Sequence, residues 1–578
     1  HRYGAAISIE ISHGGMLADP RYNCGQNPIG PSRLPQYMLD HPETLMMSGS
    51  AELVKYSQVI EMDEEMMHAV ADDFAAAAAL LQDLGFDMVQ IHLGHGWLLH
   101  QFLSPLFNRR GDRYGGSLEN RARFPIRILQ GIRDRVGPDF LIEVRVSAQE
   151  GVEGGITPRE TGIFCGMLDK IADLIHVSTG LYTDPIETRQ FSSMYVPHAC
   201  NADLAAEIKK YTSLPVGVVG GINSPEQAET IVAEGKADYV ILGRQMLSDP
   251  YFPQKAFSGK ADEIRRCIRC FNCFPGSPEE GYTDIPWPSS ELAKRVGSCT
   301  INPVSNLPFD LSEHPLPGAS EIVLVVGGGP AGMQAAITAA ERGHKVTLAE
   351  KEDRLGGLLC FTDTDVDKED LRNFKDLLIR VTYRRGVTVL LNTAADAELI
   401  ERLKPDAVIL ALGSRPAMPP IPGIDKIRHA MDVYYGCKPG KSVIMVGGGL
   451  VGCEVALHLA KSGHDVTIIE MLPRVADDSY GMYREALIRQ MSREAIRTYT
   501  NTRCLEVTTC SVRIADKDGA ETVIGADSVF YALGMKSNSA DELEKVIANA
   551  KVYKVGDCLR PAKVDSAVRE GFLAALDI

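Results

Sequence analysis

The sequence predicts an α/β protein, in which a (β/α)8, or TIM, barrel is followed by two Rossmann-like nucleotide-binding domains. Short β-branched runs alternate with helical stretches from the start of the chain to about Pro250, a pattern typical of parallel βαβ units. After a Cys- and Pro-rich stretch at 259–318, the alternation returns twice, at 322–350 and at 442–470. Six barrel strands are recognisable, whereas a closed barrel needs eight. We therefore expect the chain to be a fragment whose first two barrel strands are missing before His1.

The barrel elements can be placed in order along the chain. The predicted strands are 7–11, 88–93, 140–146, 174–177, 215–219 and 239–242, with helices such as 63–84 and 119–136 between them. Gly-rich or polar residues follow several of these strands, at 13–15, 220–221 and 243–244. They would lie at the carboxyl ends of the strands, where a barrel of this type builds its active site.

Composition narrows the class of protein. A chain of 578 residues with 45% hydrophobic and 24% charged residues can bury two or three cores. Its net charge of −16 leaves no basic face for nucleic acid, and its longest apolar run, at 74–81, is far too short to span a membrane. Thirteen Cys without a secretion signal do not suggest a disulfide framework. We expect a soluble cytoplasmic protein acting on small molecules, and a homo-oligomer is compatible with this composition.

Two histidines stand where the strand 88–93 ends, in Ile91-His92-Leu93-Gly94-His95. A single His at a strand end is more often structural than catalytic. Two of them, three residues apart at a barrel mouth, can donate hydrogen bonds to a substrate carbonyl oxygen and stabilise the enolate-like charge that develops when hydride reaches the β-carbon. His92 and His95 are therefore predicted catalytic residues.

The first nucleotide-binding motif is Ile322-Val-Leu-Val-Val-Gly-Gly-Gly-Pro-Ala-Gly332. Gly327 allows the tight turn, Gly329 lets the backbone approach a pyrophosphate, and Gly332 lets helix and strand pack closely. The next strand, 345–349, ends in Glu350, which is placed to accept hydrogen bonds from a ribose.

A second copy of the motif carries Gly447, Gly449 and Gly452, and the strand after it ends in Glu470. Two dinucleotides are therefore expected. Glu470 would repel a 2′-phosphate, which favours NADH over NADPH. Nearby Arg474 could accommodate a 2′-phosphate, so NADPH is the alternative.

Four cysteines of the intervening stretch have ligand spacing: Cys267, Cys270 and Cys273 in a C-x-x-C-x-x-C run, and Cys299 further on. Thiolates in this pattern suit a soft metal centre. A structural zinc more often uses two separated C-x-x-C pairs, so a 4Fe–4S cluster is preferred and zinc remains the alternative.

The whole chain resembles the old-yellow-enzyme relatives that fuse an FMN barrel to an iron–sulfur cluster and an FAD/NAD(P)H half, such as 2,4-dienoyl-CoA reductase, 2-enoate reductase, bile-acid-inducible steroid oxidoreductases and trimethylamine dehydrogenase. This resemblance implies four parts. They are an FMN barrel at 1–258, a cluster segment at 259–318, an FAD domain at 319–430 with 551–578, and an NAD(P)H domain at 431–550.

The resemblance also implies roles for residues outside the motifs. Glu10 would meet the FMN pyrimidine edge, and Arg145 would stand beside flavin N1 and O2. Asp557, in Val555-Gly556-Asp557, resembles the residue that meets the ribityl chain of FAD. The FMN phosphate would be cradled by Gly220, Gly221, Gly243 and Arg244.

One residue departs from the family pattern. Trp97 stands where many ene reductases have the Tyr that protonates the α-carbon, and an indole is no acid near neutral pH. Tyr182 is the predicted replacement, although it could equally line the pocket. The spacer between Cys273 and Cys299 is also longer than in the dienoyl-CoA reductase and trimethylamine dehydrogenase pattern.

The resemblance implies an activity with two alternatives. Electrons would pass from NAD(P)H through FAD and the cluster to FMN, which would reduce the activated C=C bond of an enoate, enoyl-CoA or 3-oxo steroid. One alternative is an amine dehydrogenase of the trimethylamine dehydrogenase type. The other is an electron-transfer module that serves a protein partner.

Overall fold

The computed structural model describes residues 1–2, 4–18, 20, 23–33, 59–182, 184, 186–274, 296–547 and 549–578. The chain divides into two compact units after Gly243, and each is described here by itself. No helix in these ranges combines the length and the apolar character that a bilayer crossing requires.

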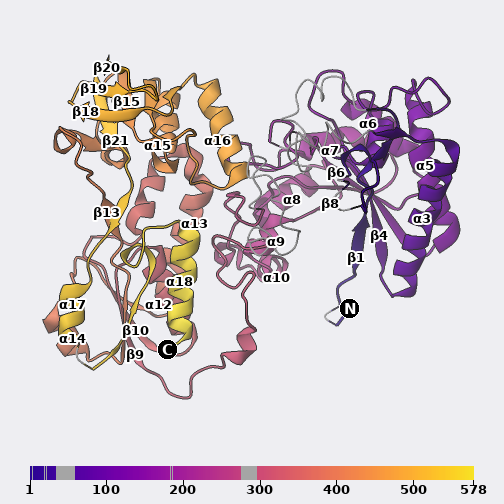
Figure 1. Ribbon diagram of the computed structural model, residues 1–578. Helices are drawn as coiled ribbons and strands as arrows, with labels where there is room; N and C mark the ends of the chain where they lie inside the picture. The colour runs from indigo at the N-terminus through magenta and orange to yellow at the C-terminus, as the bar shows by residue number, and fades with distance from the viewer. Residues whose placement is uncertain are drawn as a thin grey trace. The chain divides into compact units, whose positions relative to one another are not determined.

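The first unit is built on a parallel six-stranded sheet in the order β1-β4-β5-β6-β7-β8 (Figure 1). These strands are β1 Ser8–Ile11, β4 Met88–Leu93, β5 Leu141–Ser147, β6 Leu174–Ser178, β7 Val216–Val218 and β8 Tyr239–Val240. All six predicted barrel strands are thereby confirmed. A short parallel pair, β2 Ile29–Gly30 and β3 Ile60–Glu61, lies outside this sheet and was not predicted.

Helices alternate with these strands: α3 Glu64–Asp83, α4 Leu98–Leu103, α5 Leu118–Val136, α6 Pro158–Gly166, α7 Ala202–Ile208 and α8 Pro225–Ala233. Their first turns are fixed by side chains that accept from free backbone amides. Asp63 accepts from the Met66 amide before α3, and Thr157 and Glu160 form a reciprocal capping box before α6.

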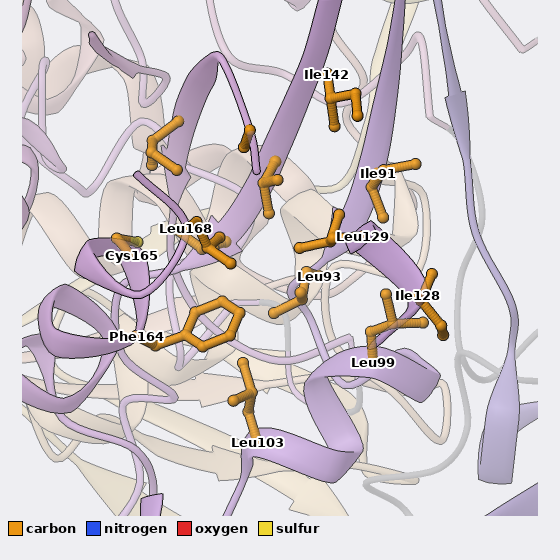
Figure 2. Packing of buried hydrophobic residues seen from close by; sticks show 14 of the residues in the cluster. Ile91, Leu93, Leu99, Leu103, Ile128, Leu129, Ile142, Phe164, Cys165 and Leu168 are labelled. Atoms are coloured by element: carbon orange, nitrogen blue, oxygen red, sulfur yellow. The ribbon is translucent and has the colours of Figure 1, made fainter. Parts of the chain in front are cut away.

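The core of the first unit lies between the sheet and the helices (Figure 2). Its members include Ile91, Leu93, Leu99, Leu103, Ile128, Leu129, Ile142, Phe164, Cys165 and Leu168. Because side chains alternate along a strand, Ile91 and Leu93 of β4 face this core while Gln90 and His92 face the other side of the sheet. The polar residues of β4, β5 and β6 therefore share one face.

The second unit holds two parallel five-stranded sheets. The first has the order β11-β10-β9-β12-β23, formed by β9 Ile322–Val326, β10 Lys345–Ala349, β11 Thr388–Leu390, β12 Ala407–Leu410 and β23 Lys551–Lys554. The second has the order β14-β21-β15-β16-β17, formed by β14 Arg428–His429, β15 Ser442–Val446, β16 Asp465–Ile469, β17 Arg497–Tyr499 and β21 Ser528–Tyr531. The two predicted Rossmann-like folds are confirmed.

Smaller elements complete the second unit. Its helices are α9 Arg244–Ser248, α10 Phe252–Phe257, α12 Pro330–Glu341, α13 Glu369–Arg384, α14 Ala397–Leu403, α15 Leu450–Lys461, α16 Gly481–Arg493, α17 Asp541–Val546 and α18 Val564–Leu576. An antiparallel sheet comprises β18 Arg503–Val507, β19 Ser511–Ala515 and β20 Glu521–Gly525. The antiparallel pair β13 Ser414–Pro416 and β22 Met535–Ser537 lies where the chain passes between the two parallel sheets.

Candidate active site

Hydrogen bonds link two histidines and a serine at the carboxyl ends of β4 and β6. Nε2 of His92 lies 3.2 Å from Nδ1 of His95, and Nε2 of His95 lies 2.8 Å from Oγ of Ser178. Both imidazoles are buried. The structure therefore brings together the two histidines predicted from the sequence.

Burial favours the neutral form of both imidazoles of this pair. Burial, with the nearby charge of Arg145, lowers the pKa of His92 to about 2 and that of His95 well below its usual value. Each neutral ring carries one N–H, so the protons can be arranged in two ways along the series of hydrogen bonds from Ser178 to His92. In one of them the Ser178 hydroxyl donates to His95, His95 donates to His92, and His92 carries its proton on Nδ1.

That Nδ1 atom is the last atom in this series of hydrogen bonds. It is buried and has no hydrogen-bond partner among the described residues. The Glu10 carboxylate lies beside it, with Oε2 3.6 Å away. In this arrangement of protons, the N–H on Nδ1 of His92 has no acceptor within the described ranges.

The turn that carries His95 has an uncommon backbone. His95 has a φ of 58°, a left-handed conformation that non-glycine residues seldom adopt. Its amide donates to Oγ of Ser147 at 2.9 Å, and the Ser147 hydroxyl donates to the Gly180 carbonyl at 2.9 Å. Such a conformation persists only where the surroundings hold it, which is common at functional sites.

Glu10 and Arg145, the two residues assigned to the flavin ring, form an ion pair beside His92. NH1 of Arg145 donates to Oε2 of Glu10 at 3.0 Å. Nε of Arg145 is buried and has no hydrogen-bond partner among the described residues. A planar ligand with carbonyl acceptors, such as a flavin, fits this donor.

His176 is a residue of this site that the sequence analysis missed. The strand registers align His92, Arg145 and His176 across β4, β5 and β6. His176 is buried, its Nδ1 lies 3.0 Å from Nε2 of Gln90, and its Nε2 has no hydrogen-bond partner in the described ranges. Burial and Arg145 lower its pKa well below the usual value. Strand alternation could have suggested its orientation, whereas the register could not be read from the sequence.

Tyr182 lies beside the same turn. Its amide donates to the His95 carbonyl at 2.9 Å, and its ring centroid is 5.2 Å from that of Trp97. The Trp97 ring is in turn 6.2 Å from His92. The structure thus places the predicted proton donor next to the histidine pair.

The residues assigned to the FMN phosphate follow β7 and β8. Gly220 and Gly221 have φ values of 149° and 67°, which favour glycine, and Gly243 has open space where a Cβ would stand. Arg244 begins α9 of the second unit, and its guanidinium lies 4.7 Å from the Phe271 ring centroid.

The two glycine turns of the second unit have matching geometry. A Cβ at Gly327 or Gly447 would lie 2.3 Å from the carbonyl oxygen of Ala411 or Ala532, and one at Gly332 or Gly452 would meet the turn itself. At the middle positions, Gly329 and Gly449, a Cβ would meet no atom closer than 3.7 Å. These middle glycines leave the helix N-terminus accessible, as a pyrophosphate requires.

Each turn is braced by the acid that ends the second strand of its sheet. Glu350 accepts from the amides of Gly328 at 2.6 Å and Glu352 at 2.9 Å. Glu470 accepts from Gly448 and Leu472, each at 2.7 Å. The acids therefore support the turn in addition to any contact with a ribose.

Asp557 lies next to the crossing between the parallel sheets. Its Oδ2 accepts from the Ser414 hydroxyl of β13 at 2.6 Å, and its carbonyl accepts from Ser537 of β22 at 2.7 Å. Gly556 before it has a φ of 68°.

Cys273 and Cys299 each lie close enough to Cys267 and Cys270 for their charges to interact, and none of the thirteen cysteines forms a disulfide. Burial raises the pKa of Cys270 to about 11 and those of Cys273 and Cys299 to about 12. The charge of Arg244 favours the thiolate forms of Cys267, Cys270 and Cys273. Cys270 is flanked by Arg269 and Phe271, whose φ values are 54° and 63°. In the described ranges, no three His, Cys, Asp or Glu side chains are grouped so that they could hold a metal ion.

Comparison with known proteins relates both units to flavoenzymes. Residues 1–263 match the NADH:flavin oxidoreductase / NADH oxidase family, and residues 322–571 match the pyridine nucleotide-disulphide oxidoreductase family. An NADH oxidase from Thermoanaerobacter brockii is 37% identical over 100% of this chain and 86% of its own length. The chain belongs to the NADH:flavin oxidoreductase / NADH oxidase family.

Other members of this family act on different substrates. A cinnamate reductase from Clostridium sporogenes is 32% identical over 100% of this chain and 85% of its own length. The structure of a 2-naphthoyl-CoA reductase superposes with a TM-score of 0.88 at 28% identity, covering 100% of this chain and 86% of that one. An N,N-dimethylglycine/sarcosine dehydrogenase from Chromohalobacter salexigens is 30% identical over 81% of this chain and 66% of its own length.

Membership of this family establishes the general activity. The chain is a flavin-dependent NAD(P)H oxidoreductase, with an FMN domain of the old-yellow-enzyme TIM-barrel type and a pyridine-nucleotide half for FAD and NADH.

Proposed function

We propose that this oxidoreductase uses NADH to reduce the activated C=C bond of an α,β-unsaturated acid or thioester. The observation that carries the proposal is the buried, neutral His92–His95 pair, whose open Nδ1 adjoins Arg145 and Glu10. The names of two relatives, cinnamate reductase and 2-naphthoyl-CoA reductase, support this substrate class. A conjugated 3-oxo steroid has the same reacting group and belongs to the proposal.

The histidines would stabilise charge on the substrate. FMN held by Glu10 and Arg145 would, when reduced, supply hydride chemistry at the β-carbon, and negative charge would develop on the carbonyl oxygen. A neutral imidazole that donates from Nδ1 of His92 stabilises this oxygen without an extra charge in the ground state. The arrangement in which Ser178 donates to His95 and His95 donates to His92 provides this N–H. In the other arrangement of protons, His92 donates from Nε2 to His95 and His95 donates from Nε2 to Ser178, which leaves no proton on Nδ1 of His92.

A proton must also reach the α-carbon. Tyr182 is the proposed donor, since it lies beside Trp97 at the turn of His95, and ordered water is the alternative. Pocket lining without proton transfer is the competing role for Tyr182.

The proposed cofactor residues fit their groups. The partnerless Nε of Arg145, with Glu10, suits the polar edge of a flavin, and Gly220, Gly221, Gly243 and Arg244 suit its phosphate. For FAD we propose the first glycine turn, Glu350 and Asp557. For NADH we propose the second turn and Glu470.

We further propose that Cys267, Cys270, Cys273 and Cys299 bind a 4Fe–4S cluster. The C-x-x-C-x-x-C spacing of the first three, the charge interaction of Cys299 with Cys267 and Cys270, and the nearby charge of Arg244 support a site for thiolates. A bound cluster supplies one-electron transfer between flavins, and a zinc ion in its place would supply none. The domain limits 1–258, 259–318, 319–430 with 551–578, and 431–550 remain part of this proposal.

An amine dehydrogenase is the second candidate, favoured by the N,N-dimethylglycine/sarcosine dehydrogenase relative. Anaerobic NADH oxidation should be measured against cinnamate, an enoyl thioester, a conjugated 3-oxo steroid and N-methylated amines. Alkene-dependent oxidation with a saturated product supports the proposal. Reduction of the enzyme by an amine, without any alkene turnover, would replace it with the second candidate.

A further inference from the structure

The peptide of Gly96 is held on both sides by two buried side chains of α4. Its amide donates to Nδ1 of His100 at 2.8 Å, and its carbonyl accepts from Nε2 of Gln101 at 2.6 Å. His100 and Gln101 are 1% and 0% exposed. Gly96 itself has a φ of 84° and stands between His95 and Trp97. The two side chains therefore fix the turn that carries the active-site residues.

The contacts of His100 define its tautomer. An amide that donates to Nδ1 requires this nitrogen to be unprotonated, so the ring proton is on Nε2. Nε2 has no hydrogen-bond partner among the described residues, and the nearest carboxylate oxygen, Oε1 of Glu150, is 3.7 Å away. Within the described ranges, this imidazole therefore makes one hydrogen bond, the one that it accepts from Gly96.

Gln101 ties the same turn to the loop after β1. Its Oε1 accepts from the Met16 amide at 3.0 Å, and its Nε2 also donates to the Gly14 carbonyl at 3.3 Å. A Cβ at Gly15 would stand 2.3 Å from Oε1 of Gln101. Gln101 thereby links the carboxyl ends of β1 and β4 through backbone groups.

We propose that His100 and Gln101 are positioning residues, which hold the Gly96 peptide and so set the orientation of His95 and Trp97 towards the substrate. Without these bonds, the left-handed conformations of His95 and Gly96 lose their support. A misplacement of about 1 Å at reacting groups can cost about 10²-fold in rate. The effect on turnover rests on the proposed function, whereas the fixing of the turn does not.

Two variants of His100 distinguish a specific hydrogen bond to Gly96 from the mere presence of a polar side chain at this position. His100→Asn can put its Oδ1 where Nδ1 accepts from Gly96, whereas His100→Gln reaches the position of Nε2. Amide exchange at Gly96, resolved by fragmentation of the 94–98 peptide, should stay slow in the Asn variant and rise at least about tenfold in the Gln variant. The rate of alkene reduction should fall by about 10²-fold in the Gln variant and be restored in the Asn variant. NADH should reduce the flavin at the original rate in both.

Controls make the outcomes decisive. His68→Gln, on the exposed side of α3, should change none of these values. If His100→Gln fails to retain flavin, Gln101→Met removes the Gly96 carbonyl bond at similar volume and provides the same test. Equal exchange in the Asn and Gln variants, or equal turnover despite different exchange, overturns the positioning role. Altered exchange in an enzyme that reduces no alkene leaves the positioning role intact and refutes the proposed function.

Discussion

At the scale of single residues, this site depends on burying histidines without their charge. His92, His95, His100 and His176 are all buried, and the pKa of each lies far below the ordinary value. The desolvation that lowers each pKa also strengthens any hydrogen bond that the ring makes to a developing oxyanion. Stability and catalysis are therefore linked at these residues.

The first prediction concerns stability against pH. The folded protein holds these histidines neutral down to a pKa of about 2 for His92 and about 3 for His100, while unfolded histidines take up protons below about 6.5. The unfolded state thus binds more protons between these values, and stability falls as the pH drops below about 6.5, by up to about 1.4 kcal/mol per histidine per pH unit. Glu150, whose pKa is raised to about 7, opposes part of this trend.

Denaturant midpoints between pH 5 and pH 7 test this prediction. The expected midpoint is lower at pH 5, and His100→Asn should weaken the dependence. A first unit that is more stable at pH 5 than at pH 7 would contradict it.

The second prediction concerns the proton donor. Tyr182→Phe should slow alkene reduction by about 10²- to 10⁴-fold, because a positioned acid is lost, and should leave NADH reduction of the flavin unchanged. Stopped-flow measurement separates the two half-reactions. Near-normal turnover in this variant, beside a collapse in His92→Ala, would assign the proton to water.

At the scale of elements, the sequence predicts what local patterns determine. The predicted helices 63–84 and 119–136 agree with α3 and α5 to within one residue at each end. Asp63 and Ser117 cap the first turns of these helices. The pairs β2–β3 and β13–β22 were missed, because strands of two or three residues depend on a distant partner. His176, His100 and Gln101 were missed for the same reason: their roles appear only when strand register and tertiary contacts are known.

The third prediction uses the likeness of the two glycine turns. Glu470 ends β16 where the adenosine ribose of a nicotinamide would lie, and the charge of nearby Arg474 is compensated by Asp477 at 2.5 Å. NADH should therefore be preferred over NADPH in kcat/KM, and Glu470→Gln should reduce this preference by about tenfold, which corresponds to ~1.4 kcal/mol. Glu350→Gln, its counterpart in the first turn, is the matched control and should change FAD content instead. A preference of the unsubstituted protein for NADPH would show that the charge of a nearby cation has a greater effect than that of Glu470.

At the scale of the whole molecule, the proposed electron transfer from FAD to FMN requires a redox centre besides the two flavins. Anaerobically purified protein should contain iron and acid-labile sulfide at about four each per chain. Cys270→Ser should lower both and leave NADH reduction of FAD intact, whereas Cys510→Ser, at an exposed thiol, should change neither. Stoichiometric zinc without iron would refute the cluster.

The central claim is that electrons from NADH end on an activated alkene. The most direct measurement is anaerobic product stoichiometry with cinnamate or an enoyl thioester, in the original protein and in His92→Ala. We expect one saturated product for each NADH oxidised, with alkene reduction lost in the variant while NADH still reduces the flavin. NADH oxidation that yields no saturated product, or that proceeds equally well without His92, would contradict it.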